Sequence, residues 1–245
     1  AFWLLVWHVV SLCVGSELVL VSHVKVVQTL FTVISDPDFL KTVWYSAARI
    51  LGGFFTALTL GTVLGWIASR FWVVETLLRP ITAVIKATPV ASFIILVLLW
   101  FSGKNLSVII SMLMVFPVIY MNVLEGIRSA DEKLLEMAQV FRLSVGKKLL
   151  YIYLPAVAPF FVSACSVSLG LCWKSGIAAE VIGTPDGSIG AVFYQAKIFL
   201  QTSELLAWTV VVVAVSVAFE KLFMLLLRLI LKKLKMEDVL NGKRA

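Results

Sequence analysis

Residues 106–125 read LSVIISMLMVFPVIYMNVLE and carry no charged side chain before Glu125. A bilayer core needs about 20 mostly apolar residues in one helix. Backbone polar groups cannot go unpaired in lipid, so such a run must be helical. Five further segments are apolar runs that reach or nearly reach this length: residues 1–15, 46–68, 81–102, 156–179 and 204–231. The sequence therefore predicts an all-α polytopic membrane protein with about six transmembrane helices.

The composition excludes an ordinary soluble protein. Of the 245 residues, 61% are hydrophobic and 14% are charged, whereas soluble domains are about 45–50% apolar and about 25% charged. The net charge is +7, but the basic residues gather at the ends of apolar runs rather than on one soluble face. We therefore expect contact with membrane lipid and no nucleic-acid partner.

The cysteines and histidines do not form a metal or redox pattern. Cys13, Cys165 and Cys172 all fall inside apolar segments, no C-x-x-C occurs, and the only histidines are His8 and His23. We therefore expect the three cysteines to be free thiols that behave as small hydrophobic side chains.

The distribution of Lys and Arg orients the chain. If residues 1–15 start in the cytoplasm, the inner loops hold most of the basic residues: Arg70, Arg79, Arg128, Lys133, Arg142, Lys147, Lys148, Lys232, Lys233, Lys235, Lys243 and Arg244. The outer loops then hold only Lys25, Lys41, Lys104 and Lys197. This bias predicts that both termini are cytoplasmic. Because Ala1 opens within an apolar run, we expect that residues precede it in the natural protein.

Small residues recur at every fourth position of the second segment. They are Gly53, Ala57, Gly61, Gly65 and Ser69. This spacing lines them along one helix face, where another backbone can approach closely. Two interpretations are open: packing inside one helix bundle, or an interface between subunits.

The connection over residues 126–155 predicts two short helices rather than a linker. Ser129 stands three residues before Glu132, which is a capping-box pattern, and Asp131 falls in the same first turn. An apolar stripe then follows at i, i+4 and i+7, formed by Leu134, Ala138 and Phe141. We expect the second helix to begin after Ser144, to carry Lys147 and Lys148, and to end at Leu154–Pro155. An amphipathic helix between two spans could lie on lipid headgroups or dock into a groove of a cytoplasmic protein.

This connection resembles the signature loop of binding-protein-dependent ABC importer permeases. That loop reads E-A-A, three residues, G, nine residues, I-x-L-P. This chain has Glu136-Met137-Ala138, then Arg142, then Ile152-Tyr153-Leu154-Pro155 at the same spacing. Met137 replaces an alanine and Arg142 replaces the glycine. A residue other than glycine at position 142 must adopt a positive φ at some cost or turn differently.

The resemblance extends over roughly residues 40–230. Phe116-Pro117, Asn122, Gly126 and Asp131 resemble the approach to the signature loop. Three further runs resemble the branch that imports nitrate, sulfonates, taurine and related compounds: Trp100-Phe101, Ala178-Ala179-Glu180-Val181-Ile182-Gly183 and Ser188-Ile189-Gly190. Residues 18–24 depart from that branch, because they lack its usual proline-containing entry.

The resemblance implies a type I ABC importer permease, with residues 1–245 as one transmembrane domain in a bacterial inner membrane. It implies outer loops at about 16–45 and 180–203, a second permease subunit (a homodimer), two cytoplasmic ATPase subunits and an extracytoplasmic solute-binding protein. The loop residues expected to contact the ATPase are Leu134, Glu136, Met137, Ala138, Phe141, Arg142, Ser144, Leu154 and Pro155. No G-x-x-x-x-G-K-[ST] motif occurs in the chain, so we expect ATP and Mg²⁺ on the partner ATPases, and neither a cofactor nor enzymatic activity in this chain.

Polar residues inside the predicted spans are candidates for the solute pathway, because placing them in lipid is costly. Lys174, beside Trp173, would favour an anionic solute if it faces the pathway, or it could snorkel to the outer interface. Glu180 suits an outer gate or a structural cap, and Lys86 suits an anchor at the inner interface. Thr88 and Ser92 flank Pro89 and could offer hydroxyls to a solute or hydrogen-bond back to their own bent helix. Four prolines are expected to bend the membrane helices: Pro89, Pro117, Pro155 and Pro159.

Three other functions are compatible with a polytopic membrane protein. A gradient-driven secondary transporter or channel predicts internal repeats and carboxylates at mid-membrane. A membrane enzyme predicts a catalytic constellation in the loops, and none is evident. An importer of this family could also carry a thiamine-precursor-like heterocycle instead of a small anion.

Overall fold

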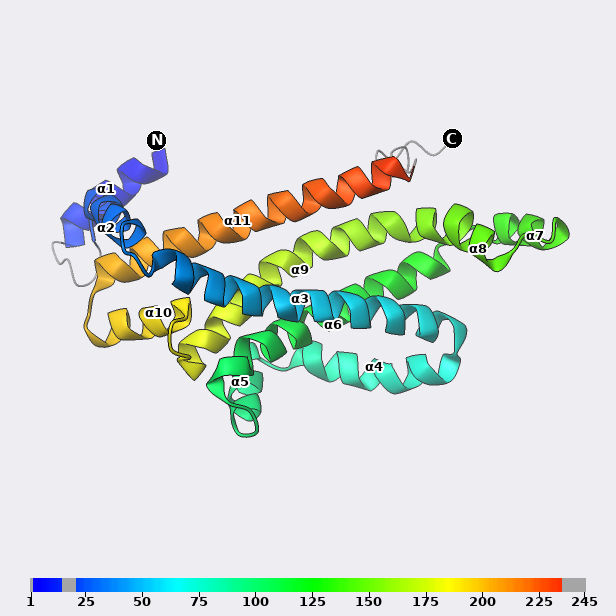
Figure 1. The fold of residues 1–245 in the computed structure, drawn as a ribbon, viewed down its shortest axis with the longest axis horizontal. Coiled ribbons are helices and arrows are strands. Elements are labelled where there is room, and N and C mark those ends of the chain that lie inside the picture. The colour runs from blue at the N-terminus through cyan, green and yellow to red at the C-terminus, as the bar shows by residue number, and fades with distance from the viewer. Residues whose placement is uncertain (1, 15–20, 235–245) are drawn as a thin grey trace.

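The computed structural model describes residues 2–14 and 21–234, and in these ranges every regular element is helical. The helices are α1 (Phe2–Val14), α2 (His23–Ile34), α3 (Phe39–Arg70), α4 (Trp72–Ala87), α5 (Val90–Leu98), α6 (Gly103–Arg128), α7 (Glu132–Val140), α8 (Val145–Lys148), the π-helical turn η1 (Leu149–Tyr153), α9 (Leu154–Gly183), α10 (Ile189–Ile198) and α11 (Thr202–Lys233). The prediction of an all-α polytopic membrane protein is confirmed (Figure 1).

Four helical runs are long and apolar enough to cross a membrane: α3, α6, α11 and the continuous run of α8, η1 and α9. A fifth span is formed if α4 and α5 are taken together, although they are bent by 105° at the break between them. The sixth predicted span, at residues 1–15, is represented by α1, whose 13 residues are shorter than a bilayer core requires.

Residues 81–102 were predicted as one span, but the structure divides them between two helices, α4 and α5. α4 already begins at Trp72, so most of the stretch assigned to an inner loop is helical. The helix then stops before Pro89, which lacks a backbone N–H and forces the preceding Thr88 into an extended conformation. The Thr88 hydroxyl donates back to the Val84 carbonyl at 2.8 Å. Proline chemistry therefore breaks this span in two.

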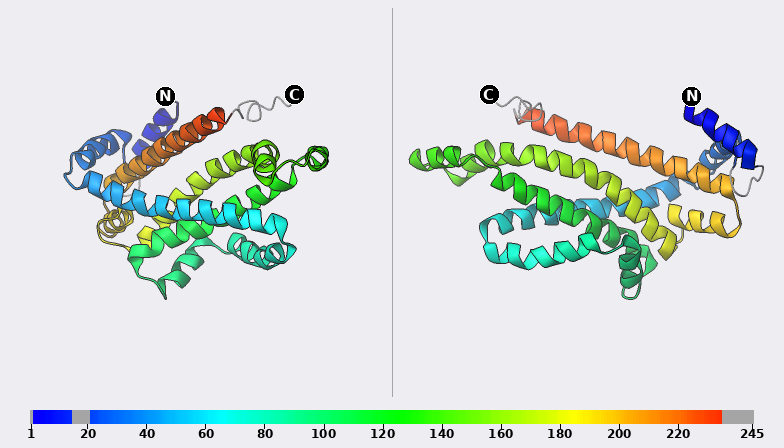
Figure 2. Two further views of the ribbon diagram at one scale, coloured as in Figure 1. Left: turned by 45° about the vertical axis from the view of Figure 1, so that its right-hand side comes forward. Right: turned by 180° about the vertical axis from the view of Figure 1, so that it is seen from behind.

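Both stretches predicted as outer loops contain a helix. α2 and α10 lie at the end of the molecule opposite α7 and α8 (Figures 1 and 2). Leu30 and Val33 of α2 and Ile189 of α10 pack with Ala207, Trp208 and Val211 of α11 in one apolar cluster. The spacing of Val26, Leu30 and Val33 was already an amphipathic helix pattern. The beginning of the first predicted outer loop, residues 16–20, lies outside the described residues.

The bundle is centred on α6, which packs against α3 on one side and α9 on the other. A Cβ atom on Gly53 would collide with the Val108 carbonyl of α6, and one on Gly61 would lie 2.9 Å from Ile119. The small-residue stripe of α3 therefore packs inside one subunit, which confirms the first of the two interpretations. Ser69, the last of the five, is only partly buried.

The core between α3, α6 and α9 joins Ile50, Phe54, Val115, Ile119, Leu169 and Trp173 with the two buried thiols Cys165 and Cys172. The Ser111 hydroxyl of α6 donates to the Cys172 carbonyl of α9 at 3.1 Å. In the described ranges no group of His, Cys, Asp or Glu is arranged to hold a metal ion. The core thus consists of apolar packing with a few internal polar bonds.

We predict that Gly53→Ala destabilises the protein by about 1–3 kcal/mol, because the added methyl group overpacks the contact with α6. Gly52→Ala is the matched control, since nothing lies within 4 Å of the position that its added methyl group would take. Alanine is the better helix former by about 1 kcal/mol, so the control should unfold no earlier than the parent. Thermal unfolding of the purified protein in detergent measures both, and equal midpoints for the two variants would contradict the close approach.

Candidate functional site: the inner loop and its connections

The N-cap of α7 is Asp131, not Ser129. The Asp131 carboxylate accepts a hydrogen bond from the Lys133 backbone N–H at 2.9 Å. Ser129 instead follows the last turn of α6, where its hydroxyl donates to the Gly126 carbonyl at 2.9 Å. The predicted capping box is therefore wrong. An aspartate directly before the first helical residue reaches the free N–H groups of α7, whereas Ser129 is still engaged by α6.

The turn after α7 has the conformation that glycine would adopt most easily, although Arg142 occupies it. Arg142 has a φ of +49°. The Leu143 N–H donates to the Ala138 carbonyl at 2.9 Å, and the Arg142 N–H donates to the Gln139 carbonyl at 3.0 Å. These two bonds form a Schellman motif. Of the two alternatives left open for residue 142, the structure has the positive φ, and the turn persists without glycine.

The loop has a small core of its own. Ala130, Ala138 and Ile152 are buried together, with Leu135, Leu143, Tyr153 and Ala156 packed around them. Ala138 is 0% exposed, so it does not belong to an outward stripe with Leu134 and Phe141 as predicted. A small side chain at residue 138 allows the returning segment at Ile152 to pack directly against α7. The alanine and isoleucine of the signature pattern thus hold the loop together.

A different set of apolar side chains faces outward, and we call it the loop-tip surface. It consists of Leu134, Met137, Val140, Phe141 and Val145. Val140 and Phe141 are 78% and 72% exposed. Glu136, Arg142 and Ser144 are exposed or half-buried beside them. Sequence reasoning missed Val140 and Val145, although the i, i+3, i+6 spacing of Leu134, Met137 and Val140 follows one side of α7.

The second short helix does not end at Leu154–Pro155. α8 continues through the π-helical turn η1 into α9, and Leu154 and Pro155 form the first turn of that span. The Leu154 N–H donates to the Leu149 carbonyl, five residues back. A widened turn just before Pro155 accommodates the proline ring and its missing N–H. The loop is thereby joined to α9 without a break.

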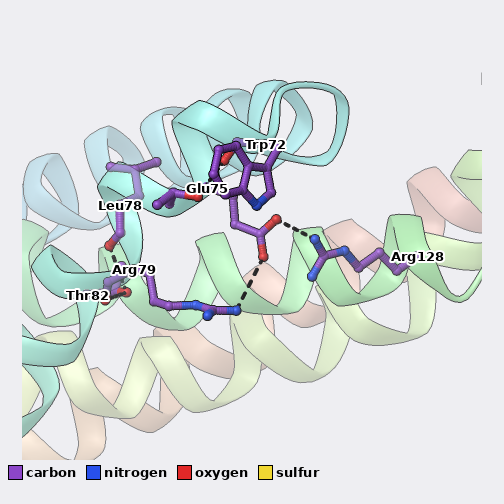
Figure 3. A network of polar contacts seen from close by, with 7 residues as sticks. Trp72, Glu75, Leu78, Arg79, Thr82 and Arg128 are labelled. Atoms are coloured by element: carbon purple, nitrogen blue, oxygen red, sulfur yellow. Dashed lines mark hydrogen bonds and ion pairs between the residues drawn. The ribbon is translucent and has the colours of Figure 1, made fainter.

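Three charged side chains join α4 to the end of α6 near the base of the loop (Figure 3). Glu75 of α4 accepts from the Arg128 guanidinium, and Arg79 approaches the same carboxylate at 3.9 Å. Arg128 is the last residue of α6, so the ion pair lies next to the start of the loop. Sequence reasoning used the two arginines only to orient the chain and missed Glu75, an acid between inner-loop cations.

Two of the runs that resemble the nitrate and sulfonate branch meet at Glu180, at the end of the molecule opposite α7 and α8. The Ser46 hydroxyl of α3 donates to the Glu180 carboxylate at 2.6 Å and accepts from the Ile189 N–H at 2.9 Å. The Gly190 N–H donates to the same carboxylate at 3.4 Å. Glu180 is 0% exposed. Its carboxylate binds the positive N-terminal end of α10, and through Ser46 it also links α9 to α3. This geometry suits the structural cap among the alternatives considered for Glu180.

The other candidate pathway residues come from the bend between α4 and α5 and from the C-terminal half of α9. Trp173 is buried in the central core, whereas Lys174 is exposed. Thr88 is held by its own helix and Ser92 is exposed. α5 packs against α9 through Ile94, Val97 and Ala179, so these two regions are neighbours. Lys86 lies at 3.4 Å from the Met121 sulfur.

Sequence reasoning also missed the charges inside the last span. Glu220, Lys221 and Arg228 fall within α11. The Ser166 hydroxyl of α9 donates to the Glu220 carboxylate at 3.1 Å. The available signal was the rule already applied to Lys174, that an ionisable residue in a membrane span is a functional candidate.

The loop, the spans and their order are the features of one protein family. The family described as "Binding-protein-dependent transport system inner membrane component" matches residues 57–236. The chain belongs to this family. The prediction of an ABC importer permease made from the loop at Glu136–Pro155 is thereby confirmed, and the chain is a multi-pass membrane protein of a transport system.

Similar proteins are transport permeases. A Bacillus subtilis chain named as a putative aliphatic sulfonates transport permease protein, SsuC, is 29% identical over 230 residues, which is 93% of this chain and 83% of that one. The taurine transport system permease protein TauC of Escherichia coli is 26% identical over 220 residues, covering 87% and 80%. The nitrate import permease protein NrtB of Synechococcus elongatus is 24% identical, covering 84% of each.

We predict that Arg142→Gly stabilises the permease by up to about 1 kcal/mol, because glycine adopts a positive φ without a Cβ clash. Arg142→Ala is the control, since alanine removes the same side chain but keeps the strained φ. Thermal unfolding in detergent should therefore rank Gly above Ala. The reverse order would show that the arginine side chain stabilises the turn more than its φ costs.

We predict that Glu75→Gln weakens the attachment of α4 by up to about 1 kcal/mol, discounted because the two arginine partners are largely exposed to solvent. Thermal unfolding of Glu75→Gln, Arg128→Gln and the double variant forms a double-mutant cycle. The coupling energy should fall as NaCl is raised, because exposed charge pairs are screened by salt. Additive single effects would mean that the ion pair contributes nothing.

Proposed function

We propose that this chain is the permease subunit of an ATP-driven importer, in which the loop-tip surface docks into a groove on a separate cytoplasmic ATPase. The observation that carries the proposal is the exposure of Met137, Val140 and Phe141 on a loop that is itself well packed. An apolar helix face of this kind requires a partner. Two permease copies, two ATPase subunits and an extracytoplasmic solute-binding protein complete the proposed assembly.

The position of the loop favours a protein partner over lipid. The run from Val145 to Gly183 has 39 residues, so it is about 58 Å long, whereas the hydrocarbon core is about 30 Å thick. Figure 2 shows α7 and α8 projecting beyond the ends of α3 and α6. The loop-tip surface therefore extends well past the apolar layer that a lipid-bound helix would occupy.

The loop is built to pass motion to the membrane helices. The loop has its own packed core, and α8 continues through η1 into α9 without a break. The Glu75–Arg128 ion pair connects the end of α6 to α4. Closure of the ATPases on ATP would then move α4, α6 and α9 together. We propose that this motion switches the two permease copies between outward and inward openings.

The proposed solute is a small oxyanion. The relatives are named for aliphatic sulfonates, taurine, nitrate and bicarbonate, and each of these carries an oxyanion group. Lys174 is exposed on the outer half of α9, where a cation would attract such a solute. A neutral heterocyclic cargo is the alternative, and it would leave Lys174 without a role in transport.

The proposed orientation places the loop end in the cytoplasm of a bacterial cell, with both termini inside. The end of α11 with Lys232 and Lys233 lies at the same end of the molecule as α7 and α8 (Figure 1). Three further basic residues were expected on the same side, and they lie outside the described residues: Lys235, Lys243 and Arg244. The excess of Lys and Arg at this end supports the orientation.

We predict that Val140→Asp together with Phe141→Asp abolishes copurification of the ATPase subunit with the permease. A carboxylate placed in an apolar groove without a partner costs several kcal/mol. Phe141→Leu is the matched control, because it keeps an apolar side chain at the same exposed position. Pull-down from solubilised membranes, together with ATP hydrolysis stimulated by the binding protein, measures the effect.

The double variant should keep the thermal midpoint of the parent permease, since neither side chain belongs to the loop core. Retained assembly with full stimulated hydrolysis would overturn the docking proposal. Solute uptake that follows an ion gradient and needs no ATPase subunit would favour the secondary transporter instead.

A further inference from the structure

A groove that carries charged side chains lies between α9 and α11, in the part of the molecule that spans the membrane. It has a volume of about 460 Å³ and is lined by Ser166, Glu220, Lys221, Met224, Leu225 and Arg228. Phe219 and Phe223 pack against the central core on its outer side, and Leu231 packs on Ala158 toward the inner end. The groove is therefore a bounded feature between two packed contacts.

The depth of these charges decides what can surround them. α11 runs from Thr202 to Lys233, so Lys221 lies about 28 Å from its outer end and about 18 Å from its inner end. Arg228 is only about 7 Å from the inner end and can reach the headgroups. Lys221 is about 10 Å further from that end of α11 than Arg228, and an ionised side chain facing hydrocarbon is costly. We therefore expect water or protein, rather than lipid tails, to cover this part of α11.

The charges in the groove are not balanced among the residues that the structure describes. The Glu220 carboxylate accepts from the Ser166 hydroxyl. Across residues 2–14 and 21–234, no carboxylate forms an ion pair with Lys221 or Arg228. Two exposed cations beside one half-buried carboxylate give the groove an excess of positive charge. Such a groove favours an anion over a cation.

We propose that the α9–α11 groove is part of the water-filled solute passage, and that Lys221, supported by Arg228, binds the oxyanion group of the solute. A hydrated passage leaves both cations solvated until the anion replaces water, so no desolvation cost arises in the empty state. Glu220, fixed by Ser166, positions α11 and keeps the site from holding the anion too tightly. This inference rests on the proposed permease function.

Cysteine labelling in the complete transporter tests whether Lys221 faces water. Cys13→Ser serves as the parent, because Cys13 is the exposed cysteine and Cys165 and Cys172 are buried. Lys221→Cys is compared with Leu222→Cys, the adjacent residue, which is also exposed on the subunit. The probe is 2-sulfonatoethyl methanethiosulfonate, a charged reagent that does not enter lipid.

We predict that Lys221→Cys reacts at least about tenfold faster than Leu222→Cys, because the reagent and the thiolate both require water. Taurine, nitrate or ethanesulfonate, each added at a saturating concentration, should slow the reaction at residue 221, and the solute that does so identifies the cargo. Labelling no faster than at Leu222→Cys would overturn the proposal.

Transport measurements separate anion binding from support of the fold. Lys221→Gln should raise the KM for the protecting solute by about tenfold, corresponding to the loss of one charge-assisted contact. Lys221→Arg keeps the charge and should restore the KM to within about threefold of the parent. Equal KM values for Gln, Arg and the parent would overturn the binding role of Lys221.

All groove variants are assayed in complexes that retain the ATPase subunit and show hydrolysis stimulated by the binding protein. If the parent chain fails to form that complex, the proposed permease function itself is wrong. If the parent transports an oxyanion but the labelling and KM results are negative, only the assignment of the groove is wrong.

Discussion

The close approach of α3, α6 and α9 is the constraint on which the rest of the structure depends. Lipid tails are as apolar as the helix surfaces, so helices in a bilayer associate through tight packing and internal polar bonds rather than through the hydrophobic effect. Gly53 and Gly61 bring α3 against the backbone of α6, and Gly126 brings α6 against α9. The Ser111 hydroxyl adds a bond across the second contact. A rigid three-helix centre results, and the remaining elements attach to it.

At each end of this three-helix centre, polar contacts attach further helices to it. At the end with α10, Glu180 receives the N-terminus of α10 and the hydroxyl of Ser46, so a buried carboxylate fixes three helices to one another. At the end with the loop, the Glu75–Arg128 ion pair ties α4 to α6 in a more exposed setting. The buried contact at Glu180 holds its helices in a fixed arrangement. The more exposed ion pair contributes less, because its charges are partly screened by solvent.

In the loop at Glu136–Pro155, residues that stand close together in the signature pattern have two different roles. Ala138 and Ile152 are buried and define the shape of the loop, whereas Met137, Val140 and Phe141 are exposed and available to a partner. Met137 stands where the family has an alanine, and in this position it enlarges the exposed apolar surface. Arg142 shows that the turn tolerates a residue other than glycine, because two backbone hydrogen bonds hold its positive φ.

The sequence by itself determined the membrane class, the approximate spans and the transport family, because hydropathy and motif spacing are local properties. It left a positive φ or a different turn open at residue 142, and the structure decided for the positive φ. The sequence also contained the pattern for α2, the acid at Glu75 among inner-loop arginines, and the charges in α11, which were not recognised. Only the tertiary structure decided that Ala138 faces inward, that Ser129 belongs to α6 and Asp131 caps α7, and that Glu180 meets Ser46 and Gly190. These assignments depend on which helix face meets which neighbour, and residues 46, 180 and 190 become adjacent only after three helices have packed.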